Sequence, residues 1–276
     1  MPPPPTVTCD LTGGLGNQLF ILCATLAYAY EHDLPIALPR FEGTHGVDGS
    51  ARPAYWDTLF RALAPLREAS DAKATGPVQR IGERDAFTHT PPPPPADGCT
   101  TIRLQGYFQH PAYTERHWNR VVAALDLSLL QTESHDAISL HFRLGDYDLL
   151  RHLYPSMTTA YYTRALAHIV AVTGRDDWAV HYAMQEDADD RVTTTLAALA
   201  EAYPRMTFVR IPPSKPDWAQ FVHLSCCRHN VIANSTFSWW AARLNRHAEE
   251  AVVVYPNRWR TRERVCVPGH WVQCEV

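Results

Sequence analysis

The sequence has very few lysines and no long run of one charge. Lys73 and Lys215 are its only lysines, so nearly all of its basic residues are arginines. Over 276 residues, 25 basic and 29 acidic residues leave a formal net charge of −4. Because such a balance creates no strong field, the charge gives no support to nucleic-acid binding or to a membrane-surface role. The arginine bias fits bidentate oxyanion binding, and it fits the base composition of a genome equally well.

Cysteine pairs, a signal segment and a long apolar run are also missing. The seven cysteines form no CxxC pair, which argues against a zinc cluster, and a disulfide framework is not expected in a chain of this size. The segment Met1–Pro5 has neither the basic nor the apolar region of a signal peptide. The longest apolar stretch, around Leu19–Tyr30, is too short to span a bilayer. We therefore expect a soluble, cytoplasmic protein with reduced thiols, no membrane span and no bound metal.

What is present is a globular composition whose pattern changes near residue 130. With 46% hydrophobic and 20% charged residues, the chain can bury a core and is not of the disordered class. Residues 40–100 show little regular pattern and include Pro91–Pro95, which is either a linker or a loop of a first domain. The sequence predicts two domains, 1–128 and 129–276, both of the α/β class.

The elements predicted after residue 130 alternate regularly between the two kinds. The predicted strands cover Ala137–Phe142, Trp178–Met184, Thr207–Ile211, Asn230–Ala233 and Ala251–Tyr255. The predicted helices cover Thr159–Val172, Asp189–Tyr203, Asp217–Ser225 and Phe237–Asn245. Strands that alternate with helices form a parallel sheet with helices on both faces. Because ligands bind beyond the carboxyl ends of such strands, the segments that follow strands are the candidates for chemistry.

The first candidate segment, GGLGNQLF, lies between a predicted strand and a predicted helix. Gly14 and Gly16 would let the backbone approach a ligand, and Asn17 and Gln18 add amide groups beside it. The segment matches neither the dinucleotide-binding nor the P-loop pattern. A tight turn that begins a helix is the alternative interpretation.

The second candidate segment, HFRLGDY, ends a predicted buried strand. His141 and Arg143 share one face of that strand, while Phe142 and Leu144 share the other. An arginine at the carboxyl end of a strand is well placed to bind a phosphate with two hydrogen bonds. The alternative is an ion pair between Arg143 and Asp146 that closes the loop.

Two further segments follow predicted strands. The third candidate segment contributes Asn234, Ser235, Thr236, Phe237 and Ser238. Hydroxyls and free N–H groups at a helix N-terminus form an anion site, although the same residues also serve as a helix cap. In the fourth segment, Glu186 and Asp187 could accept hydrogen bonds from a ribose or a base edge. A solvated acidic loop is the alternative there.

Together the motifs GGLGNQLF, HFRLGDY and NSTFSWWAARL resemble, in order and spacing, the family 11 glycosyltransferases. These are inverting α-1,2-fucosyltransferases that use GDP-fucose. The resemblance frames most of the chain apart from residues 40–130 and the last twenty or so. It implies a GT-B-like fold, with two Rossmann-like α/β halves and a cleft between them. The N-terminal half would face the acceptor and the C-terminal half would hold the nucleotide sugar, with no divalent metal.

The resemblance also implies roles for single residues. Arg143 matches the arginine that binds the β-phosphate of the donor, whereas Leu144 stands where the family usually has a second arginine. Asn17 matches an asparagine near the phosphates and the transferred sugar, and Gly14, Gly16 and Gln18 belong to its motif. Thr236 and Ser238 match hydroxyl positions near the phosphates, in one turn with Asn234, Ser235 and Phe237. Glu186 and Asp187 correspond to an acidic pair near the guanine. Apart from the resemblance, Asp146 and His141 are the candidates near Arg143 for a base, and a phosphate oxygen of the donor is the alternative.

The predicted reaction is transfer of fucose from GDP-fucose to the 2-hydroxyl of a glycan, with a β-galactoside as the expected acceptor. Two alternatives stay open, namely another inverting GDP-sugar transferase with a different acceptor and a catalytically silent sugar- or nucleotide-binding protein. Residues for an acceptor site would come from the poorly patterned region, which offers Tyr55, Trp56, Tyr107, Phe108, Gln109 and His110. Core packing explains each of these equally well.

Overall fold

The computed structural model describes residues 3–67, 76–85, 88–125, 127–128, 133–185, 189–261 and 265–276. The chain divides into two compact units, Met1–Leu127 and Ser128–Val276. The sequence analysis places its domain boundary between residues 128 and 129. In the described ranges, no helix combines the length and the apolar character needed to cross a bilayer.

The first unit is built on a small parallel sheet. Strands β1 (Thr6–Cys9), β5 (Thr101–Gln105) and β4 (Val78–Gly82) lie in the order β1-β5-β4, and both pairings are parallel. The long helix α1 (Leu15–Glu31) directly follows β1, and most of its residues are buried. The remaining elements are the hairpin β2 (Gly43–His45) and β3 (Ala51–Pro53), the 3-10 helices η1 (Arg61–Leu66), η2 (Pro111–Tyr113) and η3 (Glu115–His117), and α2 (Trp118–Leu125).

The proline run is a loop of the first unit. It lies in the connection between β4 and β5, where prolines cannot form the interior of a crossover helix. The run packs on the unit through its carbonyls, since Tyr28 Oη donates to the oxygen of Pro93 at 2.9 Å and Gln79 Nε2 to that of Pro94 at 3.0 Å. Of the two interpretations of this segment, the structure therefore selects the loop.

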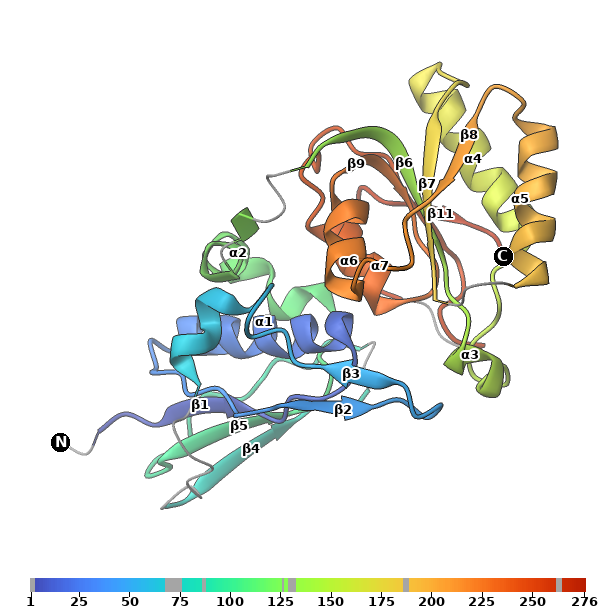
Figure 1. Ribbon diagram of the computed structural model, residues 1–276. Coiled ribbons are helices and arrows are strands. Elements are labelled where there is room, and N and C mark those ends of the chain that lie inside the picture. Colours follow the sequence, from blue (N-terminus) through green and yellow to red (C-terminus); the bar gives the residue numbers. More distant parts are fainter. Residues whose placement is uncertain are drawn as a thin grey trace. The chain divides into compact units, whose positions relative to one another are not determined.

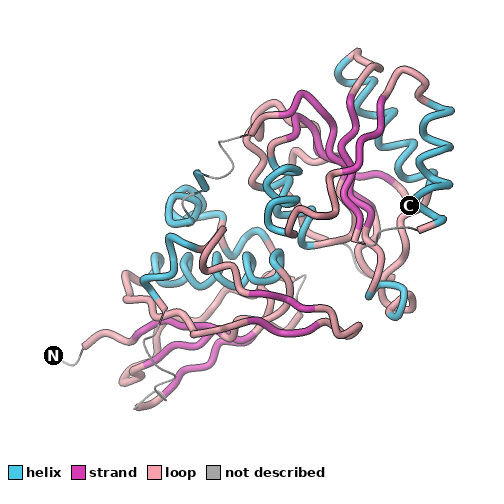
Figure 2. The backbone as a smooth tube through the Cα atoms, in the orientation of Figure 1, coloured by secondary structure: helices cyan, strands magenta, loops and turns pink. Residues whose placement is uncertain are grey.

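The second unit contains a six-stranded sheet in which every pairing is parallel. Figure 2 shows its strands, in magenta, between the helices. Its order is β11-β10-β9-β6-β7-β8. The strands are β6 (His135–Phe142), β7 (Ala179–Met184), β8 (Thr207–Arg210), β9 (Cys227–Val231), β10 (Val253–Pro256) and β11 (Val272–Cys274). The five strands predicted in this region are confirmed, and β11 is an addition that the sequence analysis did not predict.

Helices cover both faces of this sheet. Figure 1 shows α4 (Thr159–Thr173) and α5 (Asp190–Ala202) on one side and α6 (Asp217–Ser225) and α7 (Thr236–Arg243) on the other. The four predicted helices are confirmed to within a few residues at their ends, and a short helix, α3 (Asp146–Leu149), follows β6. The α/β class predicted from the alternating pattern is therefore confirmed.

Alternate residues of β6 point into two different layers, as the period of a strand requires. Phe142 and the following Leu144 belong to the apolar core that also contains Tyr161 and Tyr162 of α4. On the opposite face, the ring of His141 lies 5.5 Å from the ring of Phe237 on α7. The predicted division of these side chains between two faces is thus confirmed.

A buried polar network lies on the α6 and α7 side of the sheet. Asn230 Nδ2 donates to Ser139 Oγ at 2.6 Å and to the carbonyl oxygen of Leu224 at 3.0 Å. Asn245 Nδ2 donates to Asn230 Oδ1 at 2.5 Å and to the carbonyl oxygen of Cys227 at 2.9 Å. These bonds connect β6, β9, the end of α6 and the segment after α7, all within the core.

Candidate functional site

Arg143 lies directly beyond the carboxyl end of β6, where the sequence places it. Its guanidinium is half-buried, lies 4.3 Å above the ring of Tyr147, and donates to Gln185 Oε1 and to the carbonyl oxygen of Leu144. Gly145 then turns the chain with φ 69° and ψ −118°, a conformation that essentially only glycine adopts. The turn fixes the direction in which α3 leaves the strand, so the Arg143 loop has a defined shape.

Tyr147 connects the second and third motifs, which are far apart in the sequence. Its hydroxyl donates to the carbonyl oxygen of Asn234 at 3.0 Å, and its ring stacks on Tyr154 with centroids 4.3 Å apart. The sequence analysis assigned no role to Tyr147 or to Gln185. Both adjoin residues that it singled out, so a search for partners of Arg143 within and beside the motifs would have found them.

The third motif begins helix α7. The side-chain amide of Asn234 is buried and donates to the carbonyl oxygens of Pro155 and Trp259, at 2.9 Å and 3.1 Å. Ser238 is also buried, and its hydroxyl lies 3.3 Å from the carbonyl oxygen of Ser235, the N-cap residue of the helix. Thr236 and Phe237 at the start of the helix are half-buried. Asn234 thus shapes the turn, and Thr236 and the first N–H groups of α7 are the groups suited to an anion.

His141 is almost fully buried beneath the Arg143 loop. Burial is the main cause that lowers the pKa of His141, to about 3, and the nearby Arg143 cation lowers it further. Its Nδ1 atom is buried and has no hydrogen-bond partner among the described residues. The ring is therefore neutral at pH 7, and it is a much weaker base than an ordinary histidine.

The side chains of the three acidic candidates lie outside the part of the chain that the structure describes. Glu186 and Asp187 lie outside the described residues, and the side chain of Asp146, where α3 begins, lies outside them too. Neither the guanine contact nor the ion pair between Arg143 and Asp146 is therefore tested. Asp189, which continues the acidic run, is the N-cap of α5 and accepts the backbone N–H of Arg191 at 2.8 Å.

In the first unit, the glycine-rich segment forms the turn between β1 and α1. Gly13 has φ 78°, and a Cβ atom there would lie 2.7 Å from Asn17 Nδ2, so the position requires glycine. Gly14 is the N-cap of α1, and Gly16 is buried in its first turn. The structure therefore contains a turn that begins a helix, and contact of this segment with a ligand stays a prediction.

The two amide side chains of this segment differ in their surroundings. Gln18 is fully buried and donates to the carbonyl oxygens of Gly13 and Pro53, both at 2.8 Å, so it holds the turn against β3. Asn17 is only half-buried, and its Oδ1 accepts a hydrogen bond from Gln109 Nε2 at 3.0 Å. Asn17 and Gln109, both singled out in the sequence, are therefore neighbours in the first unit.

The aromatic residues offered for an acceptor site are mostly packing residues. Tyr55, Trp56 and Phe108 are at most 4% exposed, and Trp56 donates its indole N–H to the carbonyl oxygen of Phe41 at 2.7 Å. Tyr107 is the exposed member of the group, at 36%. Core packing thus accounts for three of the aromatic residues and leaves Tyr107 available to a ligand.

Comparisons with known proteins fit these motifs. The model of a family described as glycosyl transferase family 11 matches residues 205–268, which include the third motif. The chain is 31% identical to the O-antigen biosynthesis glycosyltransferase WbnK of Escherichia coli, over 90% of this chain and 93% of that protein.

Solved fucosyltransferases are similar at a much greater distance. A mutant of FUT1 from Arabidopsis thaliana in complex with GDP is 13% identical, with a TM-score of 0.49, over 92% of this chain and 70% of that one. NodZ from Bradyrhizobium is also 13% identical, with a TM-score of 0.44, over 89% of this chain and 94% of that one. These two likenesses are too distant to bear on the activity. The match to the family model and the relation to WbnK show that the chain belongs to glycosyl transferase family 11, the family that its three motifs predict.

Proposed function

We propose that this glycosyltransferase moves fucose from GDP-fucose to the 2-hydroxyl of a β-galactoside, with inversion and without a divalent metal. The observation that carries the proposal is the set of three family 11 motifs in order. Two of them lie together beyond the carboxyl ends of β6 and β9, joined by the hydrogen bond from Tyr147 to Asn234. That end of a parallel sheet is where ligands bind in doubly wound folds.

The proposed chemistry is a displacement at the anomeric carbon of the donor sugar. The acceptor oxygen forms the new bond while the bond from the anomeric carbon to the phosphate oxygen breaks and GDP departs. Charge grows on the departing diphosphate, so preorganised donors near it lower the barrier. In the proposed site these donors are the Arg143 guanidinium, the hydroxyl of Thr236 and the first N–H groups of α7.

The acceptor hydroxyl must also lose its proton. His141 is buried and its pKa is lowered to about 3, which makes it a poor general base at neutral pH. We assign the proton to Asp146 or to a phosphate oxygen of the donor, and we assign His141 to packing against Phe237. In the first unit we place Asn17, with its partner Gln109, among the groups that meet the sugars.

One observation favours a second candidate, a transferase for another GDP-sugar. Leu144, where the family usually has a second arginine, is 7% exposed and lies in the apolar core of the second unit. The donor diphosphate therefore has one guanidinium from this motif, and a changed donor pocket is the alternative consequence.

The test is a donor and acceptor panel with product analysis. Purified protein in EDTA is incubated with GDP-fucose or another GDP-sugar, and with lactose, other galactosides or a bacterial O-antigen saccharide, the last because WbnK is named for O-antigen biosynthesis. Mass spectrometry and linkage analysis should show deoxyhexose added at the 2-hydroxyl of galactose. Transfer from another GDP-sugar alone favours the second candidate. GDP binding without any transfer favours the silent binder, and a product that lacks the 1,2-linkage contradicts the regiochemistry.

A further inference from the structure

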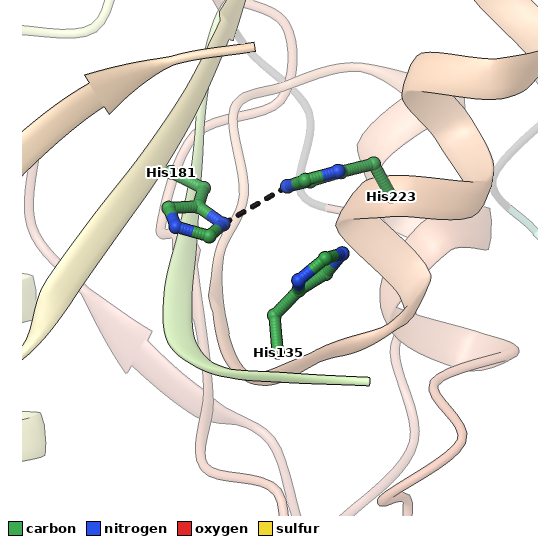
Figure 3. A group of neighbouring side chains, drawn as sticks. All are labelled: His135, His181 and His223. Carbon is green, nitrogen blue, oxygen red and sulfur yellow. Dashed lines mark hydrogen bonds between the residues drawn. The ribbon is translucent and has the colours of Figure 1, made fainter. Parts of the chain in front are cut away.

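Three histidines that no motif connects meet on the second unit. His135 begins β6, His181 lies within β7 and His223 lies in the last turn of α6. Each offers a ring nitrogen, and the three nitrogens lie within 4.8 Å of one another. Figure 3 shows the three rings turned toward a common space. Because the residues are separated by more than forty positions in the sequence, no spacing pattern could have predicted the cluster.

The contacts among the rings are close and specific. His181 Nδ1 lies 2.9 Å from His223 Nε2, a hydrogen-bond distance (Figure 3). The ring of His135 stacks on that of His223 with centroids 4.0 Å apart and lies 5.3 Å from the ring of His181. Nitrogens bound to one tetrahedral zinc ion lie about 3.3 Å apart, as Zn–N bonds of about 2.0–2.1 Å require. Small side-chain rotations therefore suffice to place an ion among the three.

A carboxylate stands beside the cluster. Glu133 Oε2 lies 3.1 Å from His135 Nε2 and 3.5 Å from His223 Nδ1. The hydrogen bond to this carboxylate comes from His135, and a carboxylate bonded to an imidazole orients ligating histidines in metal sites. Two cations lie near the cluster. The charge of Lys215 reaches both Glu133 and His223, and Glu133 offsets it at His223. The guanidinium of Arg246 donates to the backbone carbonyl oxygen of Glu133.

The cluster is open to metal ions from outside. An imidazole coordinates a metal through the lone pair of an unprotonated ring nitrogen. The three residues are only partly buried, so an ion can reach them from solvent.

We propose that His135, His181 and His223 form a binding site for a divalent transition-metal ion, with zinc as its natural occupant. Imidazole ligands suit zinc and its neighbours and do not suit magnesium or calcium. The ion would connect α6 to β6 and β7. His135 lies eight positions before Arg143, a distance of about 26 Å along a strand, so the site is separate from the proposed donor site.

The test uses the whole chain without a histidine tag, stripped of metal with a chelator. Titration with Co²⁺ should give one bound ion per chain and the visible absorption of four-coordinate cobalt, which Zn²⁺ then abolishes. In His181→Gln and in His223→Gln this spectrum should be lost. His270→Gln, in the exposed turn before β11, should bind as the unmodified chain does. Glu133→Gln should lower the affinity about 10–100-fold, the usual effect of an outer partner.

Two results would overturn the proposal. One is an unmodified chain that binds neither ion, which would make the cluster a set of hydrogen-bonded and stacked rings only. The other is unchanged binding in both His181→Gln and His223→Gln, which would put the ion elsewhere. Circular dichroism of the variants shows whether they fold, and the measurement on the unmodified chain stands without them. Neither result bears on sugar transfer, so this proposal and the proposed function fail separately.

Discussion

The two ends of the six-stranded sheet gather opposite kinds of side chain. Beyond the carboxyl ends of its strands lie the guanidinium of Arg143 and the hydroxyl-bearing turn before α7. Toward the amino ends lie three imidazoles beside Glu133. Guanidinium, hydroxyl and free N–H groups donate hydrogen bonds and suit an anion, whereas neutral imidazoles offer lone pairs and suit a cation. We thus propose two unrelated chemistries for one sheet, one at each end of its strands.

The largest effect on activity is expected when Arg143, beyond the carboxyl end of β6, is replaced. Arg143→Ala should lower kcat/KM for the nucleotide sugar roughly 10²–10³-fold, the usual loss when one preorganised donor is removed from a transition-state site. Arg143→Lys keeps the charge without the planar fork, so it should recover only part of the rate. Initial rates and GDP binding by calorimetry measure both. An Arg143→Ala variant that turns over like the unmodified chain would exclude the arginine from the leaving-group site.

Chelation should affect only the histidine cluster at the amino ends of the strands, by removing its ion. With zinc at 100 times its Kd, the ion would stabilise the folded chain by about 2.7 kcal/mol. Its removal should lower the Tm by roughly 5–10 °C in a chain of this size. Differential scanning calorimetry with EDTA or added zinc measures the shift, and a transfer assay at 25 °C should give equal rates in both conditions. Zinc-dependent transfer would contradict the separation of the two ends.

Acid should destabilise the folded chain through the buried His141. The pKa of His141 is about 3 in the folded chain, against an unperturbed value of about 6.5, so below pH 6.5 the unfolded state binds a proton that the folded state does not. Stability should therefore fall as the pH drops from about 6.5 toward 3, by up to about 1.4 kcal/mol per pH unit.

Urea unfolding of metal-free protein between about pH 7 and pH 4 measures this slope. His141→Gln should be less dependent on pH, because it removes the titrating group. His270→Gln removes an exposed histidine and should keep the slope of the unmodified chain. His223 contributes in the same direction in all three proteins, since burial lowers its pKa too. Equal slopes in His141→Gln and the unmodified chain would show that His141 titrates normally.

The smallest expected effect on activity concerns the hydrogen bond that joins the second motif to the third. Tyr147→Phe removes the hydrogen bond to Asn234 and keeps the ring beneath Arg143. A neutral hydrogen bond contributes about 0.5–1.5 kcal/mol, so kcat should fall about 2–10-fold. The matched control is Tyr203→Phe, which removes a 2.7 Å bond from a tyrosine to the carbonyl oxygen of Thr163 on α4. It should lower stability by a similar amount and leave kcat unchanged. Equal kcat values for the two variants would deny Tyr147 a positioning role.

The sequence predicts most of the second unit well because nine of its elements each follow one local helix or strand pattern. Helical and strand periods alternate cleanly after residue 130, and five strands and four helices appear where the pattern indicates them. Strand β11 has three residues, Val272–Cys274, and an exposed glutamine in its middle, so no pattern of its own distinguishes it from a loop. In the first unit, β2 and β3 are equally short, and the pairing that defines them is not written in either segment alone.

The candidate site shows the same division between local and distant information. Arg143 and Tyr147 fall in one motif, so their neighbourhood could be predicted, and the turn of Asn234 is a second motif. The two motifs come together because β6 pairs with β9, and this pairing depends on the tertiary structure. The burial of His141 and Leu144 likewise follows from the helices that cover each face. Three separate elements supply the histidine cluster, so sequence reasoning could not have assembled it.

The buried amides of Asn230 and Asn245 have a consequence for how the sheet assembles. Apolar burial alone would tolerate a β9 strand shifted along β6, because Val231 of β9 and Ile138 and Leu140 of β6 are all apolar and buried. In a shifted pairing, however, Asn230 would lose Ser139 and leave polar atoms stranded without water, at about 1–3 kcal/mol for each. The network thus acts against mispaired sheets, and it selects the one alignment that sets Ala233 and Asn234 beside the Arg143 loop.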